Sequence, residues 1–265
     1  ISLENVNVEF PIYEIAQRSV KQRLLKITSG RFKLATDAAL TVRALNDITL
    51  KASRGERIAL IGLNGAGKTT LLQTMAGIYK PCSGRRTTQG RVASMLNIML
   101  GMSGESTGYE NILLRGTFLG WKNEELRAKA REIAAFSDLG PFLDVPIRTY
   151  STGMRLRLAF AISTAITPDI LLMDEWIGFG DQSFSERAED RMMRLVARTG
   201  ILVIASHDPS LLERICFRGI VLDQGKLVYD GPIHAALQYY QGEIAHAGAR
   251  SKSRANPTRS VPAEL

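Results

Sequence analysis

The sequence predicts an α/β fold in which a parallel sheet is accompanied by a small antiparallel sheet and a helical segment. Two fully apolar stretches, ILLMDE at 170–175 and ILVIASHD at 201–208, flank a helix-rich stretch, which is typical of buried parallel strands. Residues 1–10 instead alternate apolar and polar side chains, as in a half-buried strand. With 265 residues, 45% of them hydrophobic, the chain is long enough for one large domain or two closely packed subdomains.

The antiparallel layer is predicted near the N-terminus. After the strand at 1–10, the stretch VRALNDITLKASRGERIALIG reads as a second strand, a turn at Arg54-Gly55 and a buried strand from Ile58 to Ile61. The two early strands are separated by an insertion at about 11–41. We therefore expect a β layer that leads directly into the α/β core.

The insertion is strongly basic. Between Ile15 and Thr36 six bases occur without one acid, and they account for most of the net charge of +8. Apolar residues near helical spacing predict a short amphipathic helix there. A solvated loop face is one interpretation, and a surface beside anionic lipid headgroups or a basic contact face for a partner is the other. Aromatic residues are sparse, which disfavours nucleic acid. The six bases are Arg18, Lys21, Arg23, Lys26, Arg31 and Lys33.

The middle of the chain turns helical. Thr107 and Glu110 match a capping box, in which a hydroxyl and a carboxylate bind the free amides of a helix start, and helices are expected to run to about Ala165. Further on, a hairpin is predicted around Gln224-Gly225. The residues at 242–265, rich in Ser, Ala, Arg and Pro, predict a disordered tail.

Hydropathy and cysteine content narrow the class of protein. The mean hydropathy is −0.03 and no apolar run approaches 18 residues, so we expect no spanning helix, and the N-terminus has no signal-peptide pattern. The chain is therefore expected in the cytoplasm, reaching a membrane only through a partner. Cys82 and Cys216 are far apart and belong to no metal-binding motif, which argues against a disulfide framework or a zinc site.

A phosphate-binding loop follows the buried strand. GLNGAGKTT at 62–70 fits the pattern G-x-x-x-x-G-K-[ST] between a strand and an apolar helix, a setting that disfavours an ordinary glycine-rich turn. Glycines let the backbone approach phosphates, Lys68 reaches the β and γ phosphates of ATP, and the Thr69 hydroxyl can coordinate Mg²⁺. The predicted nucleotide-binding residues of the loop are Gly62, Asn64, Gly65, Ala66, Gly67, Lys68, Thr69 and Thr70.

Two later strands end in candidate catalytic residues. Asp174 and Glu175 close an apolar strand, where Asp174 can hold Mg²⁺ through water and Glu175 can orient or deprotonate the attacking water. His207 ends the next apolar strand, near the place expected for the γ-phosphate, where it could stabilise charge in the transition state. A structural role for this histidine is the competing interpretation.

The stretch YSTGMRLRLAFA at 150–161 completes an ordered set of motifs. It begins a helix with a serine and a glycine but contains no phosphate-loop lysine, so it resembles half of an anion site. A phosphate loop, a helical insertion, this helix start, an Asp-Glu strand end and His207, in that order, resemble the ATP-binding cassette (ABC) family of transport ATPases. The resemblance implies that Ser151 and Gly153 bind the γ-phosphate held by a second subunit. Tyr150, Thr152 and Met154 depart from the commonest Leu-Ser-Gly-Gly-Gln form.

Membership of this family implies a fold and further site residues. The fold is a P-loop NTPase core, a RecA-like parallel sheet with helices, joined to an antiparallel β subdomain and an α-helical signature subdomain. The ATPase domain would span 1–241 and its helical part about 98–166. Asn97 stands where most cassettes carry a glutamine and is a candidate Mg²⁺ or water contact. Asp181 is the expected intersubunit aspartate, and Phe10, with Tyr13 as rival, the adenine-stacking aromatic.

The details of the motifs resemble one branch of the family. STGYENI, YSTGMRLRLAFA and MDEWIGFGD look like the ATPase subunits of bacterial polysaccharide exporters of O-antigen, capsule, teichoic acid and galactan. The resemblance implies an ATPase that uses ATP and Mg²⁺, pairs head to tail with a second copy and drives a lipid-linked polysaccharide through a separate permease at the cytoplasmic face of the inner membrane. The alternatives are a cassette with another cargo, or a soluble one acting on nucleic acid or ribosomes; we expect no nucleic-acid partner.

Overall fold

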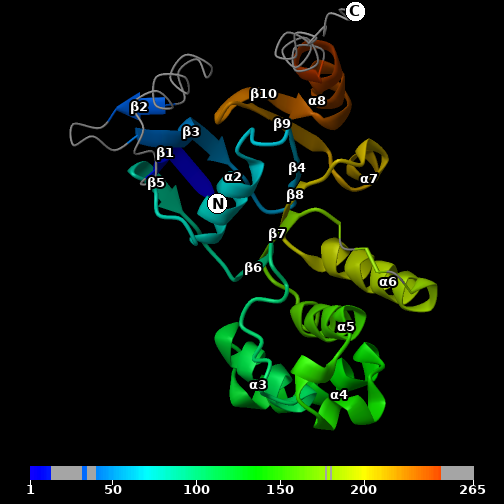
Figure 1. Cartoon of the computed structure of the whole chain (residues 1–265). Helices are drawn as coiled ribbons and strands as arrows, with labels where there is room; N and C mark the ends of the chain where they lie inside the picture. The colour runs from blue at the N-terminus through cyan, green and yellow to red at the C-terminus, as the bar shows by residue number, and fades with distance from the viewer. Residues whose placement is uncertain (13–31, 35–39, 177, 180, 246–265) are drawn as a thin grey trace, which may run out of the picture. The chain divides into compact units, whose positions relative to one another are not determined.

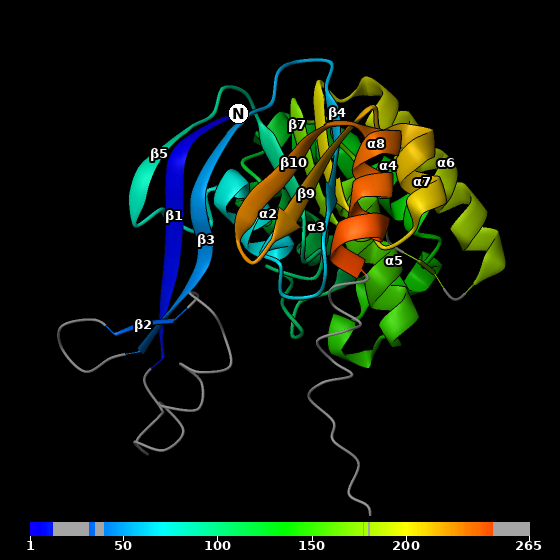
Figure 2. The same cartoon turned by 90° about the horizontal axis from the view of Figure 1, so that it is seen from above.

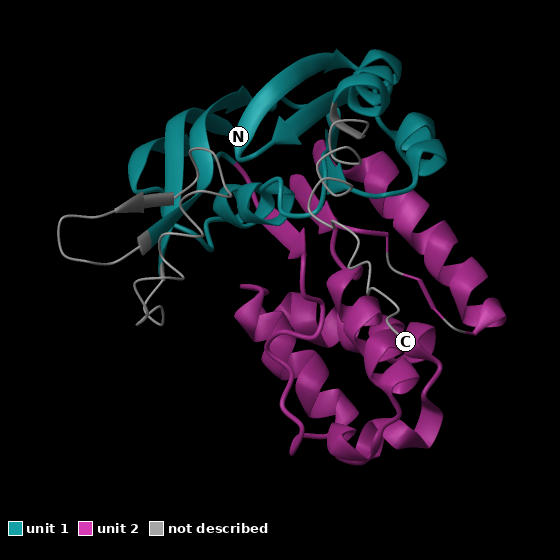
Figure 3. Ribbon diagram, turned by 45° about the horizontal axis from the view of Figure 1, so that its top comes forward, with its two compact units in different colours: residues 1–89, 203–265 teal, residues 90–202 magenta. Residues whose placement is uncertain are grey.

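The computed structural model describes residues 1–12, 32–34, 40–176, 178–179 and 181–245. The chain divides into two compact units, shown in separate colours in Figure 3. The first unit joins Ile1–Gln89 to Val203–Leu265, and the second is Gly90–Leu202. Five of the six predicted insertion bases and Tyr13 lie outside the described residues, as does the predicted tail from 246 onward. Lys33 falls in a short strand.

An antiparallel sheet forms one side of the first unit, with the strand order β2-β3-β1-β5 (Figure 2). Its strands are β1 (Ser2–Ile12), β2 (Phe32–Leu34), β3 (Leu40–Lys51) and β5 (Ser83–Thr87). Ile12 pairs with Leu40, so β1 and β3 extend into both ends of the insertion predicted at 11–41. The segment between the two strands is therefore shorter than predicted. Asn5, at φ 50°, interrupts the strict alternation through a bulge.

The first unit also carries strands of mixed direction. β4 (Arg57–Ile61) pairs in parallel with β9 (Arg218–Asp223), which pairs antiparallel with β10 (Lys226–Pro232). Gln224 and Gly225 both have positive φ, at 45° and 77°, which confirms the predicted hairpin turn.

Besides α2 (Lys68–Ala76), the first unit has three helical segments in the C-terminal part of the chain that the structure describes. They are α7 (Pro209–Ile215), α8 (Ile233–Tyr239) and a π-helix (Tyr240–Ala245), so the described structure continues past the predicted start of the tail at 242. α8 packs closely on β9 because Gly219 has no side chain: a Cβ there would lie 2.4 Å from the Cβ of Ala236.

The second unit contains parallel strands and a long helix. β6 (Val92–Met95) pairs in parallel with β7 (Ile170–Asp174), whose first four residues are buried. α6 (Gln182–Arg198) follows β7, and β8 (Ile201–Ala205), which is buried along its whole length, begins in this unit and ends in the first. The apolar stretches that predicted buried strands therefore form them, with a helix between.

Figure 1 shows the helices of the second unit's helical segment. Their buried side chains form a core of their own. The segment comprises α3 (Gly108–Phe118), α4 (Asn123–Ser137), the 3-10 turns Gly140–Asp144 and Ile147–Thr149, and α5 (Thr152–Ser163). The predicted capping box is confirmed: the Glu110 amide donates to Thr107 Oγ1 at 3.2 Å, and the Thr107 amide donates to Glu110 Oε2 at 2.8 Å. Residues from every helix of the segment meet in its core, among them Ile112, Trp121, Ile133, Leu143, Leu158 and Ile162.

Both cysteines are free: Cys82 is exposed and Cys216 is buried. Among the helices that the structure describes, none combines the length and apolar character needed to cross a bilayer.

Candidate functional site

The phosphate loop lies in the first unit, between β4 and α2 (Lys68–Ala76). Two of its glycines are required by packing under the loop. A Cβ on Gly62 would lie 2.4 Å from the carbonyl oxygen of Leu222, and one on Gly67 would lie 2.9 Å from that of Ala44. Gly65 faces open space, and its φ of +78° is what favours glycine there. The loop is therefore shaped by its own backbone and by the strand beneath it.

The side chain of Lys68 is hydrogen-bonded to carbonyl groups of the loop itself. Its ammonium donates to the carbonyl oxygens of Gly62 at 2.7 Å and Leu63 at 3.2 Å, and the residue is only 8% exposed. The N-terminus of α2 has no side-chain cap and no acid in its first turn. A positive helix end beside a buried ammonium group matches the chemistry of a phosphate chain. The loop thus fits the nucleotide phosphates that its sequence predicts.

The turn of the β9–β10 hairpin is hydrogen-bonded to the phosphate loop and supports it. The amide of Gly225 donates to the carbonyl of Ala66 at 2.8 Å, and the Gly225 carbonyl accepts from the amide of Asn46 at 2.8 Å. The turn thereby joins the phosphate loop to β3. The sequence predicts the turn but gives no sign of this contact, which depends on the register of strands far apart in the chain.

Phe10 packs beside the end of the phosphate-loop helix. Its ring meets that of Tyr79 edge to face, with the ring centroids 5.0 Å apart. Tyr79 follows the C-terminus of α2, so an aromatic pair lies in the same unit as the loop. Phe10 is half-buried, and its role toward adenine stays a prediction.

His207 lies in a short connection after β8 and is exposed. Its neighbours are fixed: the Asp208 amide donates to Ser206 Oγ at 3.2 Å, and Asp208 Oδ1 caps α7 by accepting from the amides of Ser210 and Leu211. The backbone around His207 is therefore held on both sides while its ring reaches the surface.

Asp174 and Glu175 mark the end of β7 in the second unit. Asp174 is half-buried and Glu175 is exposed. Glu175 has φ 80°, in the left-handed region that a residue with a side chain rarely adopts. Such a conformation costs about 1–3 kcal/mol and is found most often at functional sites. The strained turn sets the direction of the candidate base immediately after the candidate Mg²⁺ ligand.

The start of α5 is a capped helix N-terminus, as predicted from YSTGM. Ser151 is the N-cap, and its Oγ accepts from the amide of Met154 at 3.2 Å. Gly153 is exposed, and the nearest atom to a Cβ built there would be Ser151 Oγ at 3.9 Å. The first turn of α5 contains no acidic residue, which keeps this helix end attractive to an anion.

Tyr150, just before Ser151, holds the start of α5 against the helical core. It is buried, and its hydroxyl donates to the carbonyl oxygen of Phe142. Burial raises the pKa of this hydroxyl, with the nearby Asp144 adding to the effect. A Cβ on Gly108 would lie 2.6 Å from the Tyr150 oxygen, so α3 begins against this side chain. Met154 packs on the same helical core, which explains two departures from the common motif by packing.

Asp181 combines two contacts at the start of α6. Its Oδ1 accepts from the amide of Ser183 at 3.2 Å, capping the helix, and its Oδ2 pairs with the guanidinium of Arg157 on α5. Arg157 also lies over the ring of Phe184, 5.0 Å from its centroid. Sequence reasoning missed Arg157, because its pairing with Asp181, 24 residues later, depends on how α5 and α6 pack.

Asn97 lies in the connection after β6 and is exposed. Its Oδ1 accepts from the amide of Met99 at 3.2 Å, and its carbonyl accepts from the amide of Leu100 at 3.2 Å, as in an Asx turn. The side chain shapes this connection in the second unit. Its role toward Mg²⁺ stays a prediction.

Comparison with known proteins identifies the family. A family model described as ABC transporter matches residues 45–178. The chain is 43% identical over 228 residues to the O-antigen export system ATP-binding protein RfbE of Yersinia enterocolitica, covering 86% of this chain and 95% of that one. It is 36% identical over 251 residues to an RfbB protein of the same description from Klebsiella pneumoniae, covering 92% and 98%.

The fold agrees with this assignment. A solved dimeric ATP-binding cassette, bound to ADP and phosphate, is similar with a TM-score of 0.62 and 19% identity, over 88% of this chain and 98% of that one. A solved ATP-binding subunit of an ABC transporter gives a TM-score of 0.65 at 20% identity. The predicted α/β P-loop NTPase fold is confirmed. The chain belongs to the ABC transporter family, as a cassette that binds and hydrolyses ATP.

Proposed function

We propose that this cassette powers the export of a lipid-linked polysaccharide through a separate permease at the cytoplasmic face of the inner membrane. The observation that carries the proposal is the 43% identity to an O-antigen export ATP-binding protein over nearly the full length of both chains. Several further O-antigen export relatives match at 36% identity or more, which supports the same cargo class.

The phosphate loop holds the triphosphate of ATP in this proposal. Backbone amides of the loop and the positive end of α2 surround the phosphates, and Lys68 moves its ammonium from the loop carbonyls to the β and γ phosphates. Phe10 stacks on the adenine. The buried ammonium and the uncapped helix start support this assignment.

Magnesium would be held by a small set of oxygen ligands. The donor set fits this hard cation: Thr69 offers a hydroxyl, Asp174 a carboxylate and Asn97 an amide oxygen. When bound, the ion neutralises charge on the phosphates. Two of these residues stand next to a phosphate-binding or catalytic residue, Thr69 beside Lys68 and Asp174 beside Glu175, which supports their assignment.

Glu175 activates water for in-line attack on the γ-phosphate, accepting its proton as the new O–P bond forms and the bond between the γ-phosphorus and the bridging oxygen of the leaving ADP breaks. The exposed carboxylate on a strained turn supports this role, because the conformation fixes its direction at an energetic cost. His207 stabilises charge on the γ-phosphate in the transition state.

A second copy of the chain completes each site. Ser151 and Gly153 bind the γ-phosphate of the nucleotide held by the opposite copy, and Asp181 contributes to the same contact. The first turn of the helix that begins at Ser151 contains no acidic residue, which supports anion binding. This helix start has no phosphate-loop lysine of its own. Known cassettes of this fold have been solved as dimers, which supports the pairing.

An apolar stripe on the helical segment is our candidate for the permease contact. Tyr109 and Leu113, and Leu114 and Phe118, are pairs one helical turn apart on α3, and all four are large exposed hydrophobic side chains. Leu100 is also exposed, and a Cβ on the next residue, Gly101, would lie 3.5 Å from the Phe118 ring. Large exposed hydrophobic side chains gathered on one helix are typical of a protein interface.

Deletion of the gene in its own organism tests the proposed function. We expect surface polysaccharide to disappear and lipid-linked glycan to accumulate inside the cell. Wild-type protein and the surface control Lys51→Ala should restore export, and Lys68→Ala should fail to do so. Unchanged surface polysaccharide in the deletion strain, or loss of a different solute instead, would refute the cargo assignment.

The permease contact has its own test. The double change Leu114→Lys and Phe118→Lys should abolish co-purification with the permease while ATP binding by the isolated protein stays intact. Co-purification at the wild-type level would exclude this stripe as the interface.

A further inference from the structure

One buried arginine in the second unit lacks the partners that such a group needs. Arg115 on α3 is 4% exposed, and its guanidinium makes a single hydrogen bond, from Nη2 to Ser163 Oγ at 2.9 Å. Its Nη1 is buried and has no hydrogen-bond partner. Within the described ranges no carboxylate comes within 4 Å of this group. A guanidinium carries five N–H donors, so most of its bonding capacity is unused.

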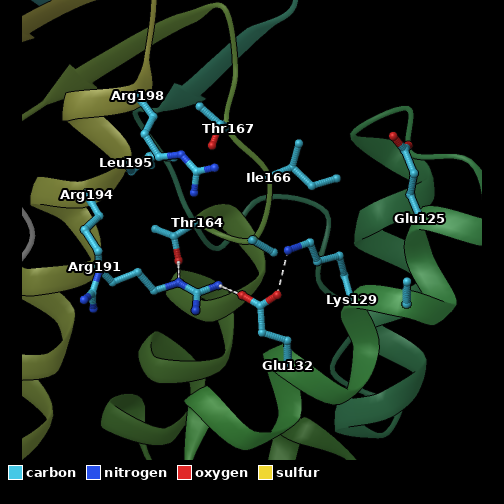
Figure 4. A pocket seen from close by; sticks show the side chains of 12 residues that line it. Glu125, Lys129, Glu132, Thr164, Ile166, Thr167, Arg191, Arg194, Leu195 and Arg198 are labelled. Carbon is cyan, nitrogen blue, oxygen red and sulfur yellow. Dashed lines mark hydrogen bonds and ion pairs between the residues drawn. The ribbon is translucent and has the colours of Figure 1, made fainter.

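Arg191 in the same unit is a largely buried arginine that has a carboxylate partner (Figure 4), although its Nη2 also lacks a hydrogen bond of good geometry. Its side chain is 14% exposed, its Nη2 lies 3.1 Å from Glu132 Oε1, and its Nε donates to Thr164 Oγ1 at 2.7 Å. It also stacks 4.3 Å from the centroid of the Phe136 ring. Arg115 has a comparable burial without a carboxylate or an aromatic face. The contrast makes the unpaired charge a feature of this position.

The charge on Arg115 is retained in spite of its burial. Desolvation lowers the pKa of Arg115 to about 10, which is still well above neutral pH. A buried charge without a partner destabilises a fold. A counter-ion inside the protein would remove most of that penalty.

A small cavity provides the room for one. Arg115 lines a pocket of about 40 Å³, partly open to solvent, that is formed by β6, the end of α3 and the connection after α5. Its lining contains two arginines, two serines and no acid, which leaves it electropositive. The volume admits a monatomic ion or a very small number of waters. The lining residues are Arg91, Val92, Ala93, Ser94, Met95, Arg115, Leu119, Trp121, Ser163, Ile166 and Pro168.

We propose that this cavity binds one small monovalent anion, such as chloride, as the counter-ion of Arg115. The unpartnered Nη1 of Arg115 is the donor that such an anion would engage, and Ser94 in the lining offers a further hydroxyl donor. Water alone could satisfy some N–H groups but would leave the charge unbalanced. The bound anion would fix α3, which carries the exposed apolar stripe, against β6, which leads to Asn97.

Anomalous diffraction tests the site directly. Crystals of the full chain grown or soaked in sodium bromide should show one bromide peak in hydrogen-bonding contact with the Arg115 guanidinium. Density for water alone, with no anomalous signal in the cavity, would overturn the proposal. This measurement needs no variant, so it remains decisive if a substitution at Arg115 fails to fold.

Thermal unfolding gives a second readout. Replacing sodium gluconate by sodium chloride at constant ionic strength should raise the melting temperature of the wild-type protein by about 3 °C, because the ion binds only the folded state. Arg115→Met should abolish the response, whereas Arg127→Met, which changes an exposed arginine of α4, should keep it. A chloride response that persists in Arg115→Met would contradict a site at this residue.

Discussion

Arg157 on α5 and Asp181 at the start of α6 form an ion pair that links the signature helix to the segment following the catalytic strand. The same aspartate caps α6 through the Ser183 amide. The predicted intersubunit aspartate is therefore tied, within one copy, to the helix whose first residues are proposed to reach the opposite nucleotide. Movement of either segment should be transmitted to the other through this pair.

Substitutions of Asp181 separate its two roles. Asp181→Asn keeps a good helix cap but removes the ion pair, which is partly exposed and should be worth at most about 1 kcal/mol. Asp181→Ala removes both and should lower the free energy of unfolding by about 1 kcal/mol more. Urea unfolding measures this difference, and ATP turnover should fall in both variants. Wild-type stability and turnover in Asp181→Ala would contradict both contacts.

Lys68→Ala should weaken ATP binding by about tenfold to a hundredfold, since a charge-assisted bond to phosphate is lost. Isothermal titration with ATP measures the affinity, and Lys51→Ala serves as the control for removing one lysine from the surface. Retained affinity in Lys68→Ala would count against the phosphate-loop role.

Gly225 should matter for nucleotide binding although it lies outside the loop. A Cβ there would lie 2.5 Å from the Ala44 carbonyl oxygen, at a φ of +77°, so Gly225→Ala should displace the turn that supports Ala66. We expect a loss of about 1–3 kcal/mol in unfolding free energy and weaker ATP binding.

Gly55→Ala is the matched control for this change. Gly55 has a φ of +92° with open space around it, so alanine there brings backbone strain without a clash. Its ATP affinity should equal that of the wild type. Equal ATP affinities in the two alanine variants would argue against support of the loop by the hairpin.

The two thiols should differ sharply in reactivity. Burial raises the pKa of Cys216 to about 12, so at pH 8 this thiol stays protonated and shielded, whereas Cys82 is exposed. Brief treatment of the folded protein with iodoacetamide, followed by peptide mass spectrometry, should find the label on Cys82 alone. Both should react in guanidinium chloride. Rapid labelling of Cys216 in the folded state would contradict its burial.

Local patterns predicted much of the fold. Four features depend on residues that are neighbours in the sequence, so short stretches predict them. They are the phosphate loop, the capping box at Thr107, the helix start at Ser151 and the turn at Gln224-Gly225. The extent of β1 and β3 was underestimated because pairing between distant residues, Ile12 with Leu40, decides where those strands end.

Contacts between distant segments escaped prediction for the same reason. Tertiary packing, which local sequence periodicity does not predict, sets three such features. They are the pairing of Arg157 with Asp181, the support of Ala66 by Gly225 and the lack of a charged partner at Arg115. Tyr150 looked like a departure from a motif, and its buried hydroxyl shows instead that it anchors the helical core.

The most direct test is the oligomeric state of Glu175→Gln with Mg·ATP, measured by size-exclusion chromatography with light scattering. Without the base, hydrolysis should stop while ATP stays bound between two copies. The predicted result is a species close to twice the 29.2 kDa of the chain, absent without ATP and absent when Lys68→Ala is added. A monomer in saturating ATP, or ATP hydrolysis at the wild-type rate, would contradict the ATP-sandwich dimer.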